Sequence, residues 1–202
     1  KMPAPAHIMQ EEIVGPSLGQ EAINSGFASF LIAFILVLAY MIFFYSNKAG
    51  IAANVALLFN VFFLIGVLAS LGATLTLPGI AGIVLTMGMA VDANVLIYER
   101  VQEEIWSGKG LKLAISDGYK HAYSAIIDGQ VTTLLTGIIL YIFGSGPIKG
   151  FATTLVIGIL TSLFTSIFIS RIIFEWMLKK NINITFTSKY TSGWLRNTKI
   201  KF

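Results

Sequence analysis

Five apolar segments, each about as long as a lipid bilayer is thick, constrain this chain more than any other feature of its sequence. A membrane-spanning helix needs about 20 mostly apolar residues. The sequence contains five segments of that kind, at residues 26–46, 51–71, 79–98, 122–143 and 150–178. They predict an all-α fold, a polytopic membrane bundle of five transmembrane helices within residues 26–180.

The composition agrees with a membrane protein and narrows the function classes. Only 12% of the 202 residues are charged and 55% are hydrophobic, whereas soluble domains carry about 25% charged residues. The chain has no cysteine, which excludes disulfides and cysteine-based metal sites. A net charge of +4 is too small to indicate nucleic acid. No nucleophile–base pair or metal cluster stands out, so we expect neither an enzyme nor a cofactor.

The distribution of lysine and arginine predicts the orientation. With five spans the two ends of the chain lie on opposite sides of the membrane. If the N-terminus is outside, the outer side holds only Lys1 and Lys149. The inner side then collects twelve basic residues: Lys48, Arg100, Lys109, Lys112, Lys120, Arg171, Lys179, Lys180, Lys189, Arg196, Lys199 and Lys201. Cytoplasmic loops carry such an excess, so we expect a cytoplasmic C-terminus.

Polar segments flank the spans at both ends. Residues 1–25 are not apolar enough to cross the membrane, and we interpret them as the end of an outer domain followed by a connector. Ser17 and Gln20 fit a capping box, which predicts a helix that starts there and runs toward the first span. Residues 181–202 are polar and basic and are expected to form a cytoplasmic linker.

The longest connection, residues 99–121, is predicted to lie on the inner side. Its apolar residues gather near one face, which suits a short helix lying in the membrane interface: Leu111, Ala114, Ile115, Gly118 and Ala122. The alternatives are topological anchoring by its lysines and docking to a partner. His121 is interpreted as a solvated polar group, and Arg171, late in the fifth span, as an anchor that snorkels inward.

One carboxylate stands out inside the stretch "GIVLTMGMAVDANVLIYER", from Gly82 to Arg100. Asp92 lies about 10 Å from the inner end of its span by helix rise, too deep for its short side chain to reach water. A charge at that depth costs several kcal/mol. A carboxyl whose charge is cheap in one conformation and costly in another can carry a proton between them. Asp92 is therefore the leading functional candidate.

Helical spacing places Asp92 on a face with small neighbours. Residues 81, 85, 88, 92 and 99 share this face. Ala81 and Gly88 permit close approach of another helix, so we expect Asp92 to face a helix seam rather than lipid. The alternative is that Asp92 and Asn94 only form hydrogen bonds between helices.

A second acid, Asp128, lies in "AIIDGQVTTLL". It is about 7 Å into the fourth span, with Thr132 one turn further on the same face. A polar residue at the start of a helix is the alternative interpretation. Between the fourth and fifth spans, Gly144, Gly146 and Gly150 fit either a hinge or a tight turn.

Three long motifs resemble the SecD family of bacterial protein-export membrane proteins. "LPGIAGIVLTMGMAVDANVLIYER" is similar to one SecD signature, and "DGQVTTLLTGIILYIFGSGPIKGFATTLVIGILTSLFTS" is similar to a second. "PAPAHIMQEEIVGPSLGQEAI" resembles the junction between SecD's large periplasmic domain and its second transmembrane helix. The resemblance covers residues 3 to about 180.

The resemblance implies an architecture. SecD belongs to the RND-type transporters, and its half of the membrane domain has six transmembrane helices. The five spans would be the second to the sixth, with the first helix and the periplasmic domain absent. The tail resembles the linker into SecF in fused SecDF chains.

The resemblance also implies a function. The family uses the proton-motive force to help the SecYEG channel move a preprotein across the inner membrane. Asp92 matches the membrane carboxylate that the family requires for proton transport, and Asp128 the acid that opens the second signature. The implied partners are a SecF half, SecYEG, the translocating preprotein and the lipid bilayer, without nucleic acid. Supporting polar or packing roles would fall to Gly88, Asn94, Gln130 and Thr132.

One departure and two alternatives accompany the resemblance. The family usually reads Asp-Ala-Asn where this chain has Asp128, Gly129 and Gln130; Gln130 keeps the amide on a longer side chain. The family's other relay groups, an Asp and an Arg, belong to the SecF half. Another RND-type proton-coupled exporter, or a structural half without its own relay, are the alternative functions.

Overall fold

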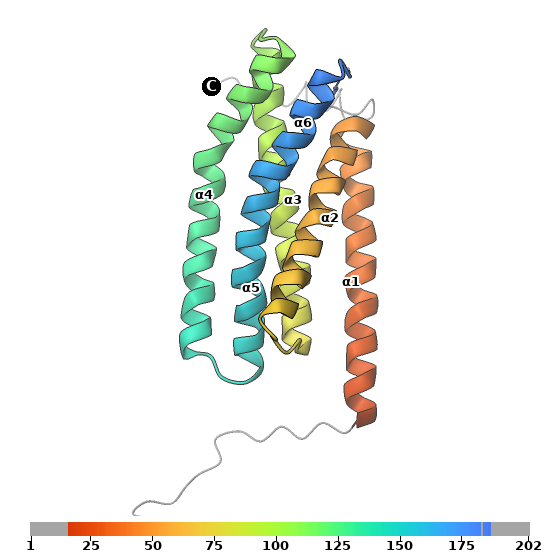
Figure 1. Cartoon of the computed structure of the whole chain (residues 1–202), viewed down its shortest axis with the longest axis vertical. Helices are drawn as coiled ribbons and strands as arrows, with labels where there is room; N and C mark the ends of the chain where they lie inside the picture. Colours follow the sequence, from red (N-terminus) through yellow and green to blue (C-terminus); the bar gives the residue numbers. More distant parts are fainter. Residues whose placement is uncertain (1–15, 183, 187–202) are drawn as a thin grey trace, which may run out of the picture.

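A computed structural model describes residues 16–182 and 184–186 and shows an all-helical bundle over this part of the chain (Figure 1). The elements are α1 (Pro16–Phe44), α2 (Asn47–Ser70), α3 (Leu77–Trp106), α4 (Leu111–Phe143), α5 (Pro147–Phe164), the π-helix η1 (Thr165–Ile169) and α6 (Ser170–Lys179). The last three follow one another without a break. Five helices, counting Pro147–Lys179 as one, are long and apolar enough to cross a membrane. The predicted fold class is confirmed.

The five long helices run up and down alternately, with α3 at the centre (Figure 1). Helix α3 contacts α1, α2, α4 and α5. Helices α3 and α5 approach closely at Gly82 of α3 and Gly158 of α5. A Cβ on either glycine would collide with a threonine of the other helix. The close α3–α5 contact therefore depends on small residues, as is usual between helices in membranes.

The helices extend beyond most of the predicted span limits. Helix α1 begins at Pro16, one residue before the predicted capping-box serine, and runs unbroken into the first span. Proline is favoured in the first turn of a helix because its missing N–H is not needed there. Residues 1–15, most of the predicted connector, and 187–202, most of the predicted linker, lie outside the described residues.

The structure corrects the prediction of a separate interfacial helix within residues 99–121. Helix α3 continues to Trp106 and α4 begins at Leu111, so only residues 107–110 connect them. The predicted apolar face exists, with Ala114, Ile115, Gly118 and Ala122 buried. It packs inward, with Gly118 against the backbone of Val101. These residues cover α3 and are part of the fourth long helix.

The turn between α4 and α5 is tight. Helix α4 ends at Phe143 and α5 begins at Pro147. Gly146 has a φ of 49°, a left-handed conformation that glycine adopts without strain. Of the two possibilities that the glycines left open, hinge or tight turn, the structure shows the tight turn.

Residues after α6 fold back onto the helix bundle. Phe186 is buried and its ring lies 5.5 Å from that of Tyr98 and 5.4 Å from that of Phe174. Thr185 Oγ1 donates a hydrogen bond to Ser46 Oγ at 2.6 Å. The start of the C-terminal segment is thus held between the α1–α2 turn and α3.

Candidate functional site

Asp92 lies at the edge of a groove between α3 and α4. The groove has a volume of about 250 Å³, and its walls combine apolar and amide side chains: Asp92, Leu96, Ile126, Gly129, Gln130 and Thr133. Asp92 is exposed in this chain. Its carboxyl therefore lies beside a partly polar groove within an otherwise apolar span.

The face of α3 that carries Asp92 is uncovered in the described part of the chain. Ala81, Leu85 and Gly88 are all exposed, and nothing lies within 4 Å of where a Cβ on Gly88 would be. This face was predicted to meet another helix closely. No described helix packs on it, and the groove with α4 borders it on one side.

Glu99, toward the C-terminal end of the same face of α3, is half-buried. Its Oε1 accepts a hydrogen bond from the Tyr45 hydroxyl at 2.9 Å. Tyr45 is almost completely buried and packs edge-on against Tyr98. Asp92 is thus followed, two turns further toward the C-terminal end of α3, by a second carboxyl with a defined partner.

Asn94 and Gln130 have different places. Asn94 is buried on the other side of α3, and its Nδ2 donates to the Ala90 carbonyl of its own helix at 3.1 Å. Gln130 is buried beside Asp92 in the groove, with its Oε1 unbonded among the described residues. Of the two amides, only Gln130 lies where it can contribute to a site with Asp92.

Asp128 and Thr132 lie on the exposed side of α4. Thr132 Oγ1 donates to the Gly129 carbonyl at 2.9 Å, so its hydroxyl is bound within its own helix. Asp128 is exposed and does not line the groove. The structure brings Asp92 and Gln130 together and leaves Asp128 outside their groove.

Sequence reasoning missed a polar contact between α2 and the π-helix. Asn60 is fully buried, and its Nδ2 donates to Thr165 Oγ1 at 3.2 Å. Thr165 is the first residue of η1, and π-helical turns commonly occur at functional sites. An asparagine inside an apolar span was the available signal, because buried amides need partners.

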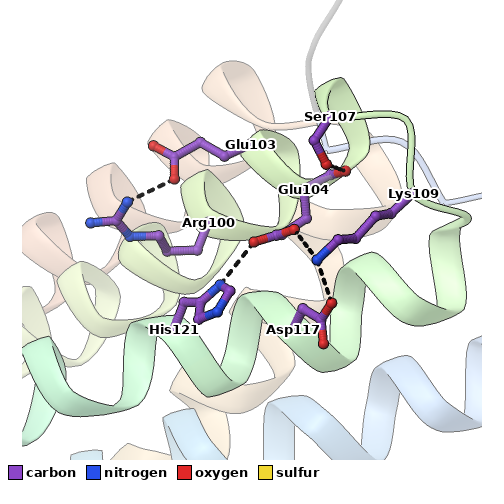
Figure 2. Close-up of polar contacts among 7 residues, drawn as sticks. All are labelled: Arg100, Glu103, Glu104, Ser107, Lys109, Asp117 and His121. Atoms are coloured by element: carbon purple, nitrogen blue, oxygen red, sulfur yellow. Dashed lines mark hydrogen bonds and ion pairs between the residues drawn. The ribbon is translucent and has the colours of Figure 1, made fainter. Parts of the chain in front are cut away.

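Ionic side chains join the ends of α3 and α4 next to their short connection (Figure 2). Lys109 Nζ lies 2.6 Å from Glu104 Oε2 and 2.6 Å from Asp117 Oδ2. Hydrogen bonds to Asp117 and Glu104 raise the pKa of Lys109 above its ordinary value. His121 Nδ1 lies 2.8 Å from Glu104 Oε1. This histidine, predicted to be a solvated polar group, belongs to a cluster that closes the turn.

Comparison with known proteins identifies the family. The model of the family "Protein export membrane protein SecD/SecF, C-terminal" matches residues 1–180. The chain belongs to the SecD/SecF C-terminal family. Within that family it is 55% identical over 177 residues to protein translocase subunit SecD of Rhodothermus marinus, and 54% identical over 177 residues to that of Desulfurispirillum indicum. The predicted resemblance is confirmed.

Structural comparison extends the likeness to three dimensions. The chain matches the crystal structure of SecDF, a translocon-associated membrane protein from Thermus thermophilus, with a TM-score of 0.83 and 40% sequence identity. The match covers 89% of this chain and 25% of the SecDF chain. The alignments cover 88% of this chain but only 28% and 34% of the two SecD relatives. The chain is a multi-pass membrane protein of the SecD/SecF family that spans about a third or less of these relatives.

Proposed function

We propose that this chain is part of a proton-driven subunit of the Sec protein-export machinery and that Asp92 carries the proton. The observation that carries the proposal is the position of Asp92, a carboxyl deep in an apolar helix beside an uncovered groove. The relatives of this chain are translocase subunits, and the similar solved structure is that of a translocon-associated protein. The role is transport-assisting rather than enzymatic. SecYEG, the translocating preprotein and a SecF half are the proposed partners.

The uncovered face supports a SecF half as the partner of Asp92. Two small residues, Ala81 and Gly88, lie with Leu85 and Asp92 on an exposed strip of α3. Small residues are what helix contacts in membranes require. In the full-length protein a cysteine at Gly88 is expected to be shielded from thiol reagents and to cross-link to a cysteine on the covering helix. Absence of any such cross-link would mean that lipid, not protein, covers this strip.

The orientation follows from the basic residues. We infer that the α3–α4 and C-terminal ends face the cytoplasm in the bacterial inner membrane and that the N-terminal end faces the periplasm. Among the described residues, Lys149 in the first turn of α5 is the only lysine or arginine near that inferred outer end. A cysteine near Lys109 should be protected from an impermeant reagent added outside, and one at Ser145 should be labelled. The reverse pattern would overturn the orientation.

Export of a slow-folding precursor, with and without a proton gradient, tests the function. Asp92→Asn keeps the size and polarity of the side chain but cannot ionise. The variant is expected to assemble normally and to lose the gradient-dependent part of export. Asp92→Glu keeps ionisation and should be partly active, because its carboxyl is displaced by about 1.5 Å and proton transfer needs hydrogen-bond distances of about 2.6–3.2 Å.

The control variant is Glu103→Gln, which removes a carboxylate from the exposed side of α3. Glu103 pairs with Arg100 at 2.7 Å and its side chain is 54% exposed. Export in this variant should match wild type. If Asp92→Asn also retains gradient-dependent export, the structural-half alternative is favoured. If the gradient drives movement of a small molecule but not of the precursor, the alternative of a different RND-type exporter is favoured.

A further inference from the structure

A groove between α4 and α6, at the end of the bundle that carries the α3–α4 turn, combines basic and apolar walls. Its volume is about 410 Å³. Three basic side chains line it, Lys112 from α4 and Arg171 and Lys179 from α6, together with one acid, Glu175. Ile115 and Leu178 supply apolar surface. The lining therefore has an excess of positive charge beside hydrocarbon.

The cations of this groove are available to a ligand. Lys112 and Lys179 have no ion-pair partner among the described residues. Arg171 Nε lies 3.1 Å from Glu175 Oε1, but both side chains are 55% exposed, and exposed pairs of this kind hold each other weakly. Tyr119 also lines the groove, and its hydroxyl is already hydrogen-bonded to Ser170 Oγ at 2.6 Å. The groove can therefore bind an anion through its lysine and arginine side chains.

Exposed tryptophans place the groove at the level of the lipid headgroups. Trp176 on α6 is 53% exposed and Trp106, at the end of α3, is 46% exposed. Both lie at the end of the bundle that carries the α3–α4 turn and α6 (Figure 1). Tryptophan concentrates where hydrocarbon meets the headgroups. Ile172, 61% exposed on α6, continues the helix surface toward the bilayer centre.

We propose that this groove binds the headgroup phosphate of an anionic phospholipid, with Lys112, Arg171 and Lys179 as its contacts. Basic pockets between transmembrane helices bind anionic headgroups in this way. The apolar walls at Ile115 and Leu178 accommodate the glycerol and the first carbons of the acyl chains. A soluble anion uses the cations but gains nothing from these walls.

The test uses the full-length protein in nanodiscs containing equal amounts of phosphatidylglycerol and phosphatidylcholine. Native mass spectrometry measures which lipid the protein retains. Wild type is expected to enrich phosphatidylglycerol. Each basic residue near an anionic headgroup changes affinity by roughly fivefold. The triple variant Lys112→Gln, Arg171→Gln, Lys179→Gln should therefore reduce the enrichment by about tenfold or more. Its replaced side chains are exposed, so the fold is expected to survive.

Two control variants isolate the groove. Lys120→Gln removes an exposed cation from the same helix outside the groove and should keep the enrichment. The double variant Lys112→Arg, Lys179→Arg keeps the positive charge and should also retain the enrichment of phosphatidylglycerol. Unchanged enrichment in the triple variant would overturn the proposal. Displacement of phosphatidylglycerol by inorganic phosphate at millimolar concentration would also overturn it, since the groove would then be a site for free anions.

Discussion

At the scale of single residues, glycines determine how closely the helices approach. A Cβ on Gly118 would lie 2.8 Å from both the Cα and the N of Val101. Backbone atoms cannot move aside as the end of a side chain can. The sequence pattern correctly predicts that Gly118 lies on an apolar face. Its close neighbour Val101 lies on a different helix, α3. Helical periodicity does not show which residues of two helices meet.

Gly118→Ala is therefore expected to destabilise the bundle by about 1–3 kcal/mol, the range for overpacking a tight contact. Thermal unfolding of the purified protein in detergent measures the effect. Gly66→Ala is the matched control, because nothing lies within 4 Å of a Cβ there. Alanine is the better helix former by about 1 kcal/mol, so the control should be neutral or slightly more stable. Equal stability of the two variants would contradict the close α3–α4 contact.

At the scale of elements, the α3–α4 connection is a short turn held by charge. Lys109 lies between Glu104 and Asp117 (Figure 2). The predicted separate helix was wrong because an apolar face flanked by lysines also fits the first turns of a longer helix, here α4. In the structure Lys109 pairs with Glu104 and Asp117 across the two helix ends, and the apolar face remains available to pack on α3.

Lys109→Met should loosen this turn, because Glu104 and Asp117 would then lie close together without a cation. Faster amide hydrogen exchange at residues 107–110 is the expected result, with Lys120→Met as a control that leaves exchange unchanged. The pKa of Lys109 is raised in the folded state. Its stabilisation is thus fully present below the ordinary lysine pKa of about 10.4 and is lost as the pH rises through the higher folded value.

The difference in melting temperature between wild type and Lys109→Met should therefore be constant at neutral pH and shrink in strongly alkaline buffer. A difference that disappears near pH 7 would contradict the assignment of the stabilising charge to Lys109.

At the scale of the whole molecule, the five-helix bundle and the family could both be predicted from the sequence. Length and hydropathy define the spans, and the long motifs around Asp92 and Asp128 define the family. Which of the candidate site residues lie together could not be predicted. Asp92 and Gln130 share a groove because α3 and α4 pack against each other, whereas Asp128, two residues before Gln130, lies on a different side of α4.

The uncovered face of α3 also belongs to this scale. A chain that aligns with about a third or less of its SecD relatives leaves a strip around Asp92 that no described helix covers. The activity of the proposed relay is therefore to be measured in the full-length protein.

Proton flux through the full-length protein in sealed vesicles tests the central claim most directly. With an imposed proton gradient, wild type should show protein-dependent flux, and Glu103→Gln should match it. Asp92→Asn should lose the flux by at least about tenfold, the equivalent of about 1.4 kcal/mol in the barrier, while it inserts and purifies as wild type does. Undiminished flux in a well-assembled Asp92→Asn protein would contradict the account, because Asp92 would then be a packing residue and the proton would move elsewhere.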